Sequence, residues 1–365
     1  MPKSYGGLYP QIYAFENLWL AYRNARKGKR QVKDTALFEL RAEENLFALQ
    51  EVLQEERFEF SGYRTFLITD PKERLICAAP FRDRVVHHAL CNIITPLLDR
   101  CMIRDTYACR VGKGTHRAIN KAYEYVNKEA WVLKMDLQKY FFTIDHALLL
   151  AQLRRKIRDK AVLSLIQNLL ATYHSDDRYY FPSPNDDLFS IQRPRGLPIG
   201  NLTSQWFANY FLNGLDHKMT QHPKVKGYVR YMDDLAIFAS EKQDLVAIKE
   251  TVLDALAALR LHAHPQKTQI FPAKNGFPFL GFVLKPHHKR IKRENLKRFK
   301  ARLARQQKAL AQESITFDHI TQSLQAWMGF IGKGRYIGLI DEILSHYPLK
   351  HQANTKTLCV SYDGF

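Results

Sequence analysis

The stretch Gly227-Tyr-Val-Arg-Tyr-Met-Asp-Asp-Leu-Ala-Ile-Phe-Ala239 places two adjacent carboxylates, Asp233 and Asp234, between two apolar runs. Neighbouring residues on a strand point to opposite faces, so two aspartates inside one strand could not serve one site. The two runs instead predict a hairpin that turns at Met232 and Asp233, which brings both carboxylates to the bend. Paired carboxylates repel each other, and a divalent cation removes that penalty. For an Asp-Asp pair taken alone, a solvated polar turn is the alternative.

A third carboxylate, Asp136, ends the run Trp131-Val-Leu-Lys-Met-Asp136, which predicts a strand over 131–136. Active-site carboxylates commonly lie at strand ends, exposed but held by a buried sheet. Asp145 is a competitor, but it precedes a leucine-rich segment and is better interpreted as a helix N-cap. An aspartate after one strand, a long insertion and then an Asp-Asp hairpin are typical of a two-metal phosphoryl-transfer site.

A glycine loop lies between the two acidic segments, in Arg195-Gly-Leu-Pro-Ile-Gly-Asn-Leu-Thr-Ser-Gln205. A helix is predicted to begin near Thr203 or Ser204, because large apolar residues then recur at helical spacing. These residues are Trp206, Phe207, Tyr210, Phe211 and Leu215. A glycine loop entering a helix lets the backbone approach a nucleotide or a template base.

Together these segments resemble the palm of a reverse transcriptase: Asp136 matches motif A, Tyr231-Met-Asp-Asp234 matches motif C, and the glycine loop matches motif B. In most reverse transcriptases motif B reads Gln-Gly, three residues, Ser-Pro. This chain has Ile199-Gly200 and Ser204-Gln205 at these positions instead, and its motif is similar to that of diversity-generating retroelement reverse transcriptases. The flanking segments that agree are 78–87, 107–117 and 279–282, and the resemblance runs from about residue 16 to about residue 310.

The resemblance implies an α+β, right-hand polymerase fold with fingers, a palm of antiparallel sheet plus helices, and a helical thumb. The implied domains are fingers over 1–130, palm with motif A over 131–145, a fingers/palm insertion over 146–195, palm with motifs B, C, D and the primer grip over 196–285, and thumb over 286–365. The primer grip is assigned to the hairpin around Phe279-Leu-Gly-Phe282.

For catalysis, the resemblance implies two Mg²⁺ ions, for which Mn²⁺ can substitute, bound by Asp136, Asp233 and Asp234. Leu137, the next residue after the motif A aspartate, is included in the metal site. Lys267 matches the motif D lysine proposed to protonate pyrophosphate.

A substrate-binding set is implied in the same way: Arg74, Arg82, Phe141, Ile199, Gly200 and Gln205. Arg74 and Arg82 match fingers positions that cradle the triphosphate, since arginine offers bidentate contacts to phosphate. Phe141 matches the aromatic residue that closes the pocket against a ribose 2′-hydroxyl, with core packing as the alternative. Arg84 and Arg110 are weaker candidates, for which surface solvation is an equal alternative.

The chain is strongly basic, with a formal net charge of +19 over 365 residues, which indicates an extended polyanionic partner. From Lys285 to Lys308 there are eleven Lys or Arg residues against one acid. Leu296, Phe299, Leu303 and Leu310 recur there at helical spacing, so one helix face is predicted to pack while the others present positive charge. A merely solvated face is the alternative to duplex binding. The expected nucleic-acid contacts are Lys292, Arg293, Lys297, Arg298 and Lys300.

Two local patterns give further predictions. Phe38, Leu40 and the leucines at 46, 49 and 53 outline one amphipathic helix. Ser240-Glu-Lys-Gln243 has the form of a capping box that opens a helix.

Composition excludes several protein classes. The five cysteines are widely spaced, which argues against a disulfide framework or a zinc site. No apolar run is long enough to span a membrane and Met1-Pro-Lys-Ser4 lacks the pattern of a signal peptide, so a cytoplasmic protein without membrane contact is expected.

The function predicted from these resemblances is an RNA-directed DNA polymerase that copies a template-repeat RNA with errors at adenines. Its expected partners are dNTPs, the template RNA, the cDNA/RNA duplex and a small basic oligomeric accessory protein. One alternative is an antiphage or domesticated reverse transcriptase that uses another noncoding RNA. Another is an RNA-binding scaffold without turnover, against which the intact Asp136, Asp233 and Asp234 argue.

Overall fold

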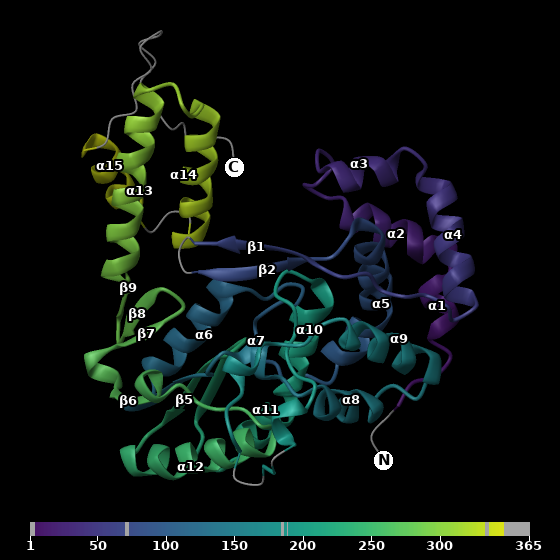
Figure 1. The fold of residues 1–365 in the computed structure, drawn as a ribbon. Helices are drawn as coiled ribbons and strands as arrows, with labels where there is room; N and C mark the ends of the chain where they lie inside the picture. Colours follow the sequence, from purple (N-terminus) through teal and green to yellow (C-terminus); the bar gives the residue numbers. More distant parts are fainter. Residues whose placement is uncertain (1–3, 70–72, 184–185, 188, 333–335, 347–365) are drawn as a thin grey trace. The chain divides into compact units, whose positions relative to one another are not determined.

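The computed structural model describes residues 4–69, 73–183, 186–187, 189–332 and 336–346 (Figure 1). The chain divides into two compact units, Met1–Ala273 and Lys274–Phe365. The first unit holds the predicted carboxylate site, and the second holds the predicted basic helix.

The first unit begins with four helices that pack on one another, several of them also on the long helix α5. Their bounds are α1 Tyr9–Tyr13, α2 Phe15–Ala25, α3 Lys33–Glu39 and α4 Ala42–Gln54, followed by α5 Phe81–Asp99 and, further along the chain, α6 Thr115–Val126. The single amphipathic helix predicted through residues 38–53 is wrong, because the chain breaks between Glu39 and Ala42. Leu40 is 80% exposed at this break, so it does not belong to the buried leucine face of α4.

Between α4 and α5 the chain forms an antiparallel two-stranded hairpin, β1 Arg64–Ile68 and β2 Arg74–Ala78. Most of its side chains are exposed, although Cys77 near the end of β2 is buried. The hairpin therefore projects from the body of the first unit with one end anchored (Figure 1).

A four-stranded sheet in the order β4-β5-β3-β6 forms the centre of the first unit. Its strands are β3 Trp131–Asp136, β4 Gly227–Tyr231, β5 Asp234–Ala239 and β6 Gln269–Pro272, and the neighbours are antiparallel. The predicted strand over 131–136 and the hairpin turning at Met232 and Asp233 are both confirmed. Helix α12 (Lys242–Ala258) packs on β3 and β5, and α6 packs on β4 (Figure 1).

The predicted capping box before α12 is wrong. The helix begins at Lys242, its N-cap residue is Glu241, and no side chain caps it. The Ser240 hydroxyl instead lies 3.0 Å from a carboxylate oxygen of Glu129, which precedes the start of β3 by two residues. The N-cap predicted at Asp145 is confirmed, since its carboxylate accepts a hydrogen bond from the Leu148 amide at 2.9 Å.

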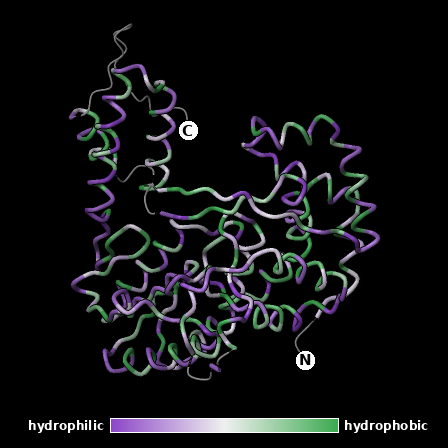
Figure 2. The backbone as a smooth tube through the Cα atoms, viewed as in Figure 1, coloured by the Kyte–Doolittle hydropathy of each residue, from purple (hydrophilic) through white to green (hydrophobic). Residues whose placement is uncertain are grey.

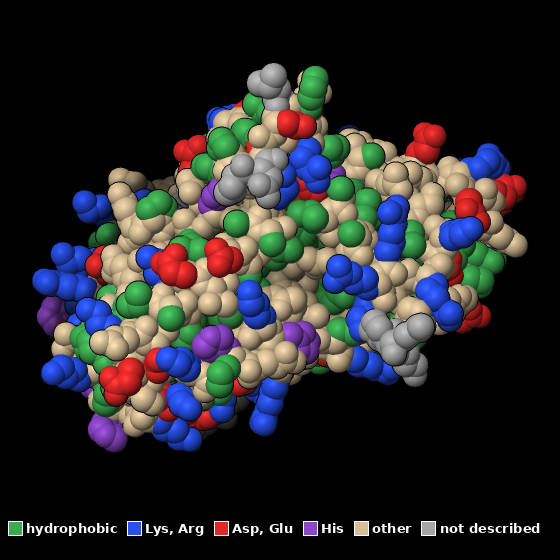
Figure 3. Space-filling view, turned by 90° about the horizontal axis from the view of Figure 1, so that it is seen from below, with side chains coloured by type: hydrophobic (Ala, Val, Ile, Leu, Met, Phe, Trp, Pro, Cys, Tyr) green, Lys and Arg blue, Asp and Glu red, His purple; other side chains and the backbone are tan. Residues whose placement is uncertain are grey.

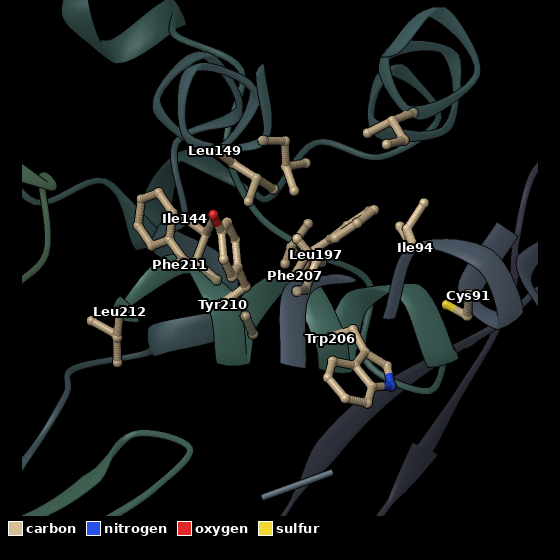
Figure 4. Packing of buried hydrophobic residues seen from close by; sticks show 14 of the residues in the cluster. Cys91, Ile94, Ile144, Leu149, Leu197, Trp206, Phe207, Tyr210, Phe211 and Leu212 are labelled. Atoms are coloured by element: carbon tan, nitrogen blue, oxygen red, sulfur yellow. The ribbon is translucent and has the colours of Figure 1, made fainter. Parts of the chain in front are cut away.

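The first unit also contains further helices and short turns. They are α7 Tyr140–Thr143, α8 His146–Arg154, α9 Lys160–Ala171, α10 Leu202–Phe211 and α11 Asn213–Thr220, with short 3₁₀ turns η1 Asp177–Tyr179, η2 Ser190–Gln192, η3 Pro265–Lys267 and η4 Ala273–Asn275. Helix α10 begins at Leu202, slightly before the predicted Thr203 or Ser204. Its side chains Phe207 and Phe211 point into the main core with Leu149 and Leu197 (Figure 4).

The second unit consists of a small antiparallel sheet followed by helices. Its elements are β7 Phe277–Phe279, β8 Phe282–Lys285, β9 His288–Ile291, α13 Arg293–Ala311, α14 Phe317–Ile331 and α15 Ile337–His346. The Phe299 ring of α13 stacks on the Trp327 ring of α14, with centroids 3.7 Å apart. Phe299, Leu303 and Leu310 are buried and Leu296 is half-buried, so the predicted apolar face of the basic helix is confirmed, while its other residues are largely hydrophilic (Figure 2).

The mixture of helices and antiparallel sheets confirms the expected α+β class. Among the residues described, no helix combines the length and apolar character needed to cross a membrane. The end of the central sheet that carries the hairpin turn is where the acidic side chains gather.

Candidate functional site

Three aspartates meet at one end of the central sheet. Asp136, the last residue of β3, is paired directly with Asp234, the first residue of β5. Residues opposite each other in an antiparallel pair project from the same face. Asp233 lies in the two-residue turn just before β5, and its carbonyl accepts a hydrogen bond from the Leu137 amide at 3.3 Å. The structure therefore brings together Asp136, Leu137, Asp233 and Asp234 as the sequence predicted.

The turn has an unusual backbone. Met232 adopts a φ of 57°, in the left-handed region that side-chain-bearing residues seldom occupy. A non-glycine residue persists in that region only where the surroundings over-determine the conformation. The catalytic candidates thus sit on a turn whose shape is imposed by packing rather than by intrinsic preference.

Burial and mutual repulsion disfavour the ionised carboxylates. Burial, with the neighbouring charges of Asp234 and Asp136, raises the pKa of Asp233 to about 6. Burial likewise raises the pKa of Asp234, against the opposing attraction of Lys134. The site therefore concentrates negative charge that calls for a positive partner.

Two lysines supply part of that positive charge. Lys267 Nζ lies 3.0 Å from Asp136 Oδ1, so the structure brings the predicted motif D lysine to the carboxylates. Lys134 Nζ lies 3.0 Å from Asp234 Oδ1. Sequence reasoning missed Lys134, although a signal was present: it precedes Asp136 by two residues on a strand, and such residues share a face.

The donor set suits a hard cation. Mg²⁺ binds through one or two carboxylates plus substrate phosphates rather than in an all-protein cage. In the described part of the chain, no group of three or more His, Cys, Asp or Glu side chains could hold a metal ion by itself. Asp136, Asp233 and Asp234 fit the carboxylate share of such a site, and the charge density that raises the pKa of Asp233 is what a dication would neutralise.

The glycine loop before α10 is tied to the β1–β2 hairpin. The Ile199 carbonyl accepts a hydrogen bond from the Cys77 amide at 2.8 Å, and the Asn201 side-chain amide donates to the Cys77 carbonyl at 3.1 Å. Gly200 has a φ of 120°, and a Cβ there would lie 3.0 Å from Ile76 Cγ2. The backbone angle favours glycine at this position, and the close approach of β2 would crowd any larger residue.

Phe141 and Gln205 lie on either side of this loop in sequence. The Phe141 carbonyl accepts a hydrogen bond from Leu197 at 2.7 Å, and its half-buried ring meets Tyr140 edge-on. Gln205 is exposed on α10, with its side-chain oxygen 3.6 Å from Cys109 Sγ. Phe141 therefore borders the loop and also contacts the core, so both interpretations of it stand.

The predicted phosphate-binding arginines differ in availability. Arg74 and Arg82 are exposed, at the start of β2 and in the first turn of α5, and the Arg82 guanidinium lies 4.5 Å from the centre of the Phe58 ring. Arg84 lies 3.7 Å from Asp34, and the largely buried Arg110 pairs with Asp99 at 2.5 Å. Among the ion pairs between described residues, Arg84 and Arg110 each take part and Arg74 and Arg82 do not.

The basic helix of the second unit offers a row of cations. Arg293, Lys297 and Arg298 are exposed, while Lys292 and Lys300 are half-buried. Lys292 lies 3.8 Å from Glu294, and Arg298 hydrogen-bonds Asn295. On the face drawn in Figure 3, Lys and Arg side chains are dispersed with acids between them, so net charge alone does not locate the nucleic-acid contact.

Comparison with known proteins identifies the class. The model of the family "Reverse transcriptase (RNA-dependent DNA polymerase)" matches residues 69–284, a segment that contains all three aspartates and the glycine loop. This chain belongs to the reverse transcriptase family.

Individual relatives are more distant. The putative COX1/OXI3 intron 1 protein of Saccharomyces cerevisiae is 25% identical over 281 residues, which cover 62% of this chain and 33% of that protein. The group II intron-encoded protein LtrA of Lactococcus lactis subsp. cremoris is 23% identical, over 59% of this chain and 34% of that protein. The chain thus spans about a third of the length of these relatives. Among solved structures, apo telomerase from Candida tropicalis aligns with a TM-score of 0.44 and 11% identity, over 64% of this chain and 49% of that chain.

The raised pKa of Asp233 yields a prediction about stability. A carboxyl whose folded pKa of about 6 exceeds its ordinary 3.8 destabilises the fold above pH 6, and this penalty disappears as pH falls below the unfolded value. Asp233→Asn should therefore raise the free energy of unfolding at about pH 8 by at most about 3 kcal/mol, and by much less at about pH 4.5. Urea unfolding in EDTA measures the difference.

Added Mg²⁺ provides the control for this stability measurement. Mg²⁺ should stabilise the wild type more than the Asp233→Asn variant, because it binds the ionised carboxylate. A variant that gains no stability at high pH would show that Asp233 is not held in a repulsive environment.

The basic helix yields a prediction about binding. Each phosphate-contacting Lys or Arg removed from Arg293, Lys297 and Arg298 should reduce the slope of log affinity against log salt by about one. Fluorescence anisotropy with a labelled RNA/DNA duplex measures the slope, and Glu313→Gln, which lies beyond the end of α13, serves as the control. If the variant with all three residues changed to alanine binds with unchanged affinity and slope, these cations form only a solvated face and do not contact phosphates.

Proposed function

We propose that this protein is an RNA-directed DNA polymerase that extends a primer with dNTPs on an RNA template by two-metal nucleotidyl transfer. The observation that carries the proposal is the pairing of Asp136 with Asp234 beside Asp233 in the turn. Family membership supports it, because the matched segment includes these residues.

In this proposal the three carboxylates, with Leu137 beside them, would hold the divalent ions together with substrate phosphates, and the ions would supply positive charge to the attacking hydroxyl and to the leaving pyrophosphate. Lys267, whose Nζ lies 3.0 Å from Asp136 Oδ1, would donate a proton to the leaving pyrophosphate. Lys134 stays beside Asp234 and limits repulsion while substrate is absent. Arg74 and Arg82, which are both exposed, would meet the triphosphate.

We infer further that the enzyme is of the diversity-generating type and copies a template-repeat RNA with errors at adenines. The support is the amino-acid sequence of the glycine loop, where Ile199 replaces the usual glutamine before Gly200. The small basic accessory protein and the division into fingers, palm and thumb belong to the same proposal. α13 is then part of the thumb and its cations contact the cDNA/RNA duplex.

The first test is primer extension. Purified protein with an RNA template, a primer, dNTPs and Mg²⁺ should synthesise cDNA, and the pair Asp233→Asn with Asp234→Asn should reduce synthesis by at least about a thousandfold, because both charged ligands are lost.

The control for this test is a measure of folding. The double variant should unfold in a cooperative thermal transition at a temperature no lower than that of the wild type, since it removes repulsive charges rather than packing. Synthesis by the folded double variant would overturn the two-metal assignment. RNA binding by a wild type that makes no cDNA would favour the scaffold alternative.

Fidelity provides the second test. Ile199→Gln restores a hydrogen-bonding side chain beside the expected nascent base pair, so misincorporation opposite template adenine should fall by about tenfold while synthesis continues. Sequencing of cDNA copied from one defined RNA measures the error rate at each base.

Ile199→Val is the matched control, because it keeps a branched apolar side chain and should keep the adenine errors. Equal error rates at all four bases in the wild type would contradict the diversity-generating type. They would favour a related reverse transcriptase that serves defence or another cellular role.

A further inference from the structure

Arg230 is a fully buried charged residue in a strand whose other residues are uncharged. β4 reads Gly227-Tyr-Val-Arg-Tyr231, and the Arg230 and Asp216 side chains are both 0% exposed. An arginine in such surroundings persists only if its donors are satisfied by well-placed partners. Where those partners lie indicates what the arginine does.

The Arg230 guanidinium makes contacts to three elements. It donates to both carboxylate oxygens of Asp216 in α11, at 2.7 and 2.6 Å. It donates to the side-chain oxygen and the carbonyl oxygen of Asn209 in α10, at 3.0 and 2.8 Å. It also donates to the carbonyl oxygen of Met232, in the hairpin turn, at 3.0 Å.

The contact with Met232 acts directly on the acidic turn. The Met232 carbonyl belongs to the planar peptide that joins Met232 to Asp233. A hydrogen bond to this oxygen therefore fixes the orientation of that peptide plane, and with it the position of the Asp233 backbone nitrogen. Met232 has the left-handed φ of 57° that needs external support. Arg230 supplies support of this kind from inside the same hairpin.

The contact with Asn209 links that turn to the glycine loop. Asn209 lies on α10, the helix that the loop enters, and is itself fully buried. Its side-chain amide donates to the Ala108 carbonyl at 2.7 Å, which anchors it independently of Arg230. One rigid guanidinium therefore joins the carboxylate turn to the helix that follows the expected template-facing loop.

We propose that Arg230 is a positioning residue that sets the Met232–Asp233 peptide relative to α10 and so aligns Asp233 with the substrate. It touches no reacting atom and acts through the turn. The proposal rests on the polymerase function proposed above, and concerns a residue of that site which sequence reasoning did not single out.

Lysine distinguishes positioning from simple charge balance. Arginine presents five donors in a planar fork, whereas lysine is a compact charge that cannot reach Asp216, Asn209 and Met232 together. Arg230→Lys keeps the positive charge opposite Asp216 but loses the fork. It should lower kcat by about 100-fold with KM for dNTP nearly unchanged, as expected when a catalytic group is misplaced by about 1 Å.

A second variant separates catalysis from stability. Arg230→Met with Asp216→Leu and Tyr228→Phe replaces the buried polar cluster by apolar groups, since the Tyr228 hydroxyl also bonds Asp216 at 2.8 Å. Such replacement commonly preserves stability where the removal of one partner does not. This triple variant should melt at a higher temperature than Arg230→Met alone, and its kcat should remain about 100-fold below that of the wild type.

Leu256→Ala, in the buried face of α12, is the matched control. It lowers the melting temperature through a cavity and should leave kcat per folded molecule unchanged. Full kcat in Arg230→Lys, or in the triple variant, would overturn the positioning role. If the triple variant fails to fold, the kcat of Arg230→Lys alone tests the positioning role. A wild type without polymerase activity would refute the proposed function instead, which separates the two failures.

Discussion

The register between β3 and β5 is the constraint on which the site depends. It places Asp136 opposite Asp234, and a slip of one residue would move one carboxylate to the other face of the sheet. The register is held by pairs such as Leu133 with Ile237 and Met135 with Leu235, all fully buried. A polar site is thus located by hydrophobic packing several residues away, and the acids themselves oppose the arrangement they occupy.

That opposition explains why so many internal contacts converge on one end of the sheet. Burial and repulsion raise the pKa of Asp233, and the left-handed Met232 adds backbone strain. The buried guanidinium beneath the turn and the two lysines beside the acids offset these costs. Stability gained in the core offsets a local geometry that is unfavourable without a ligand, which is common at sites that bind charged substrates.

The sequence predicted the elements whose cause is local. The alternation around the hairpin, the strand ending at Asp136 and the apolar face of α13 follow from residues close in the chain, and the structure confirms them. The break near Leu40 was missed because neither glycine nor proline marks it. The arginine beneath the turn was missed because a charge inside a strand is explained only by its partner. Lys134 had a signal in its spacing from Asp136, but its partner Asp234 lies 100 residues away in sequence.

The close packing of Gly200 against Ile76 has an evolutionary consequence. Ile76 lies on a strand remote in sequence from the acids, yet its methyl group would have to shift before the glycine could carry even one additional carbon. A larger or smaller side chain at position 76 shifts the wall against which the loop rests. Selection can therefore adjust the position of the glycine loop by exchanging one aliphatic residue for another in the β1–β2 hairpin. The acids and their lysines remain untouched by such changes.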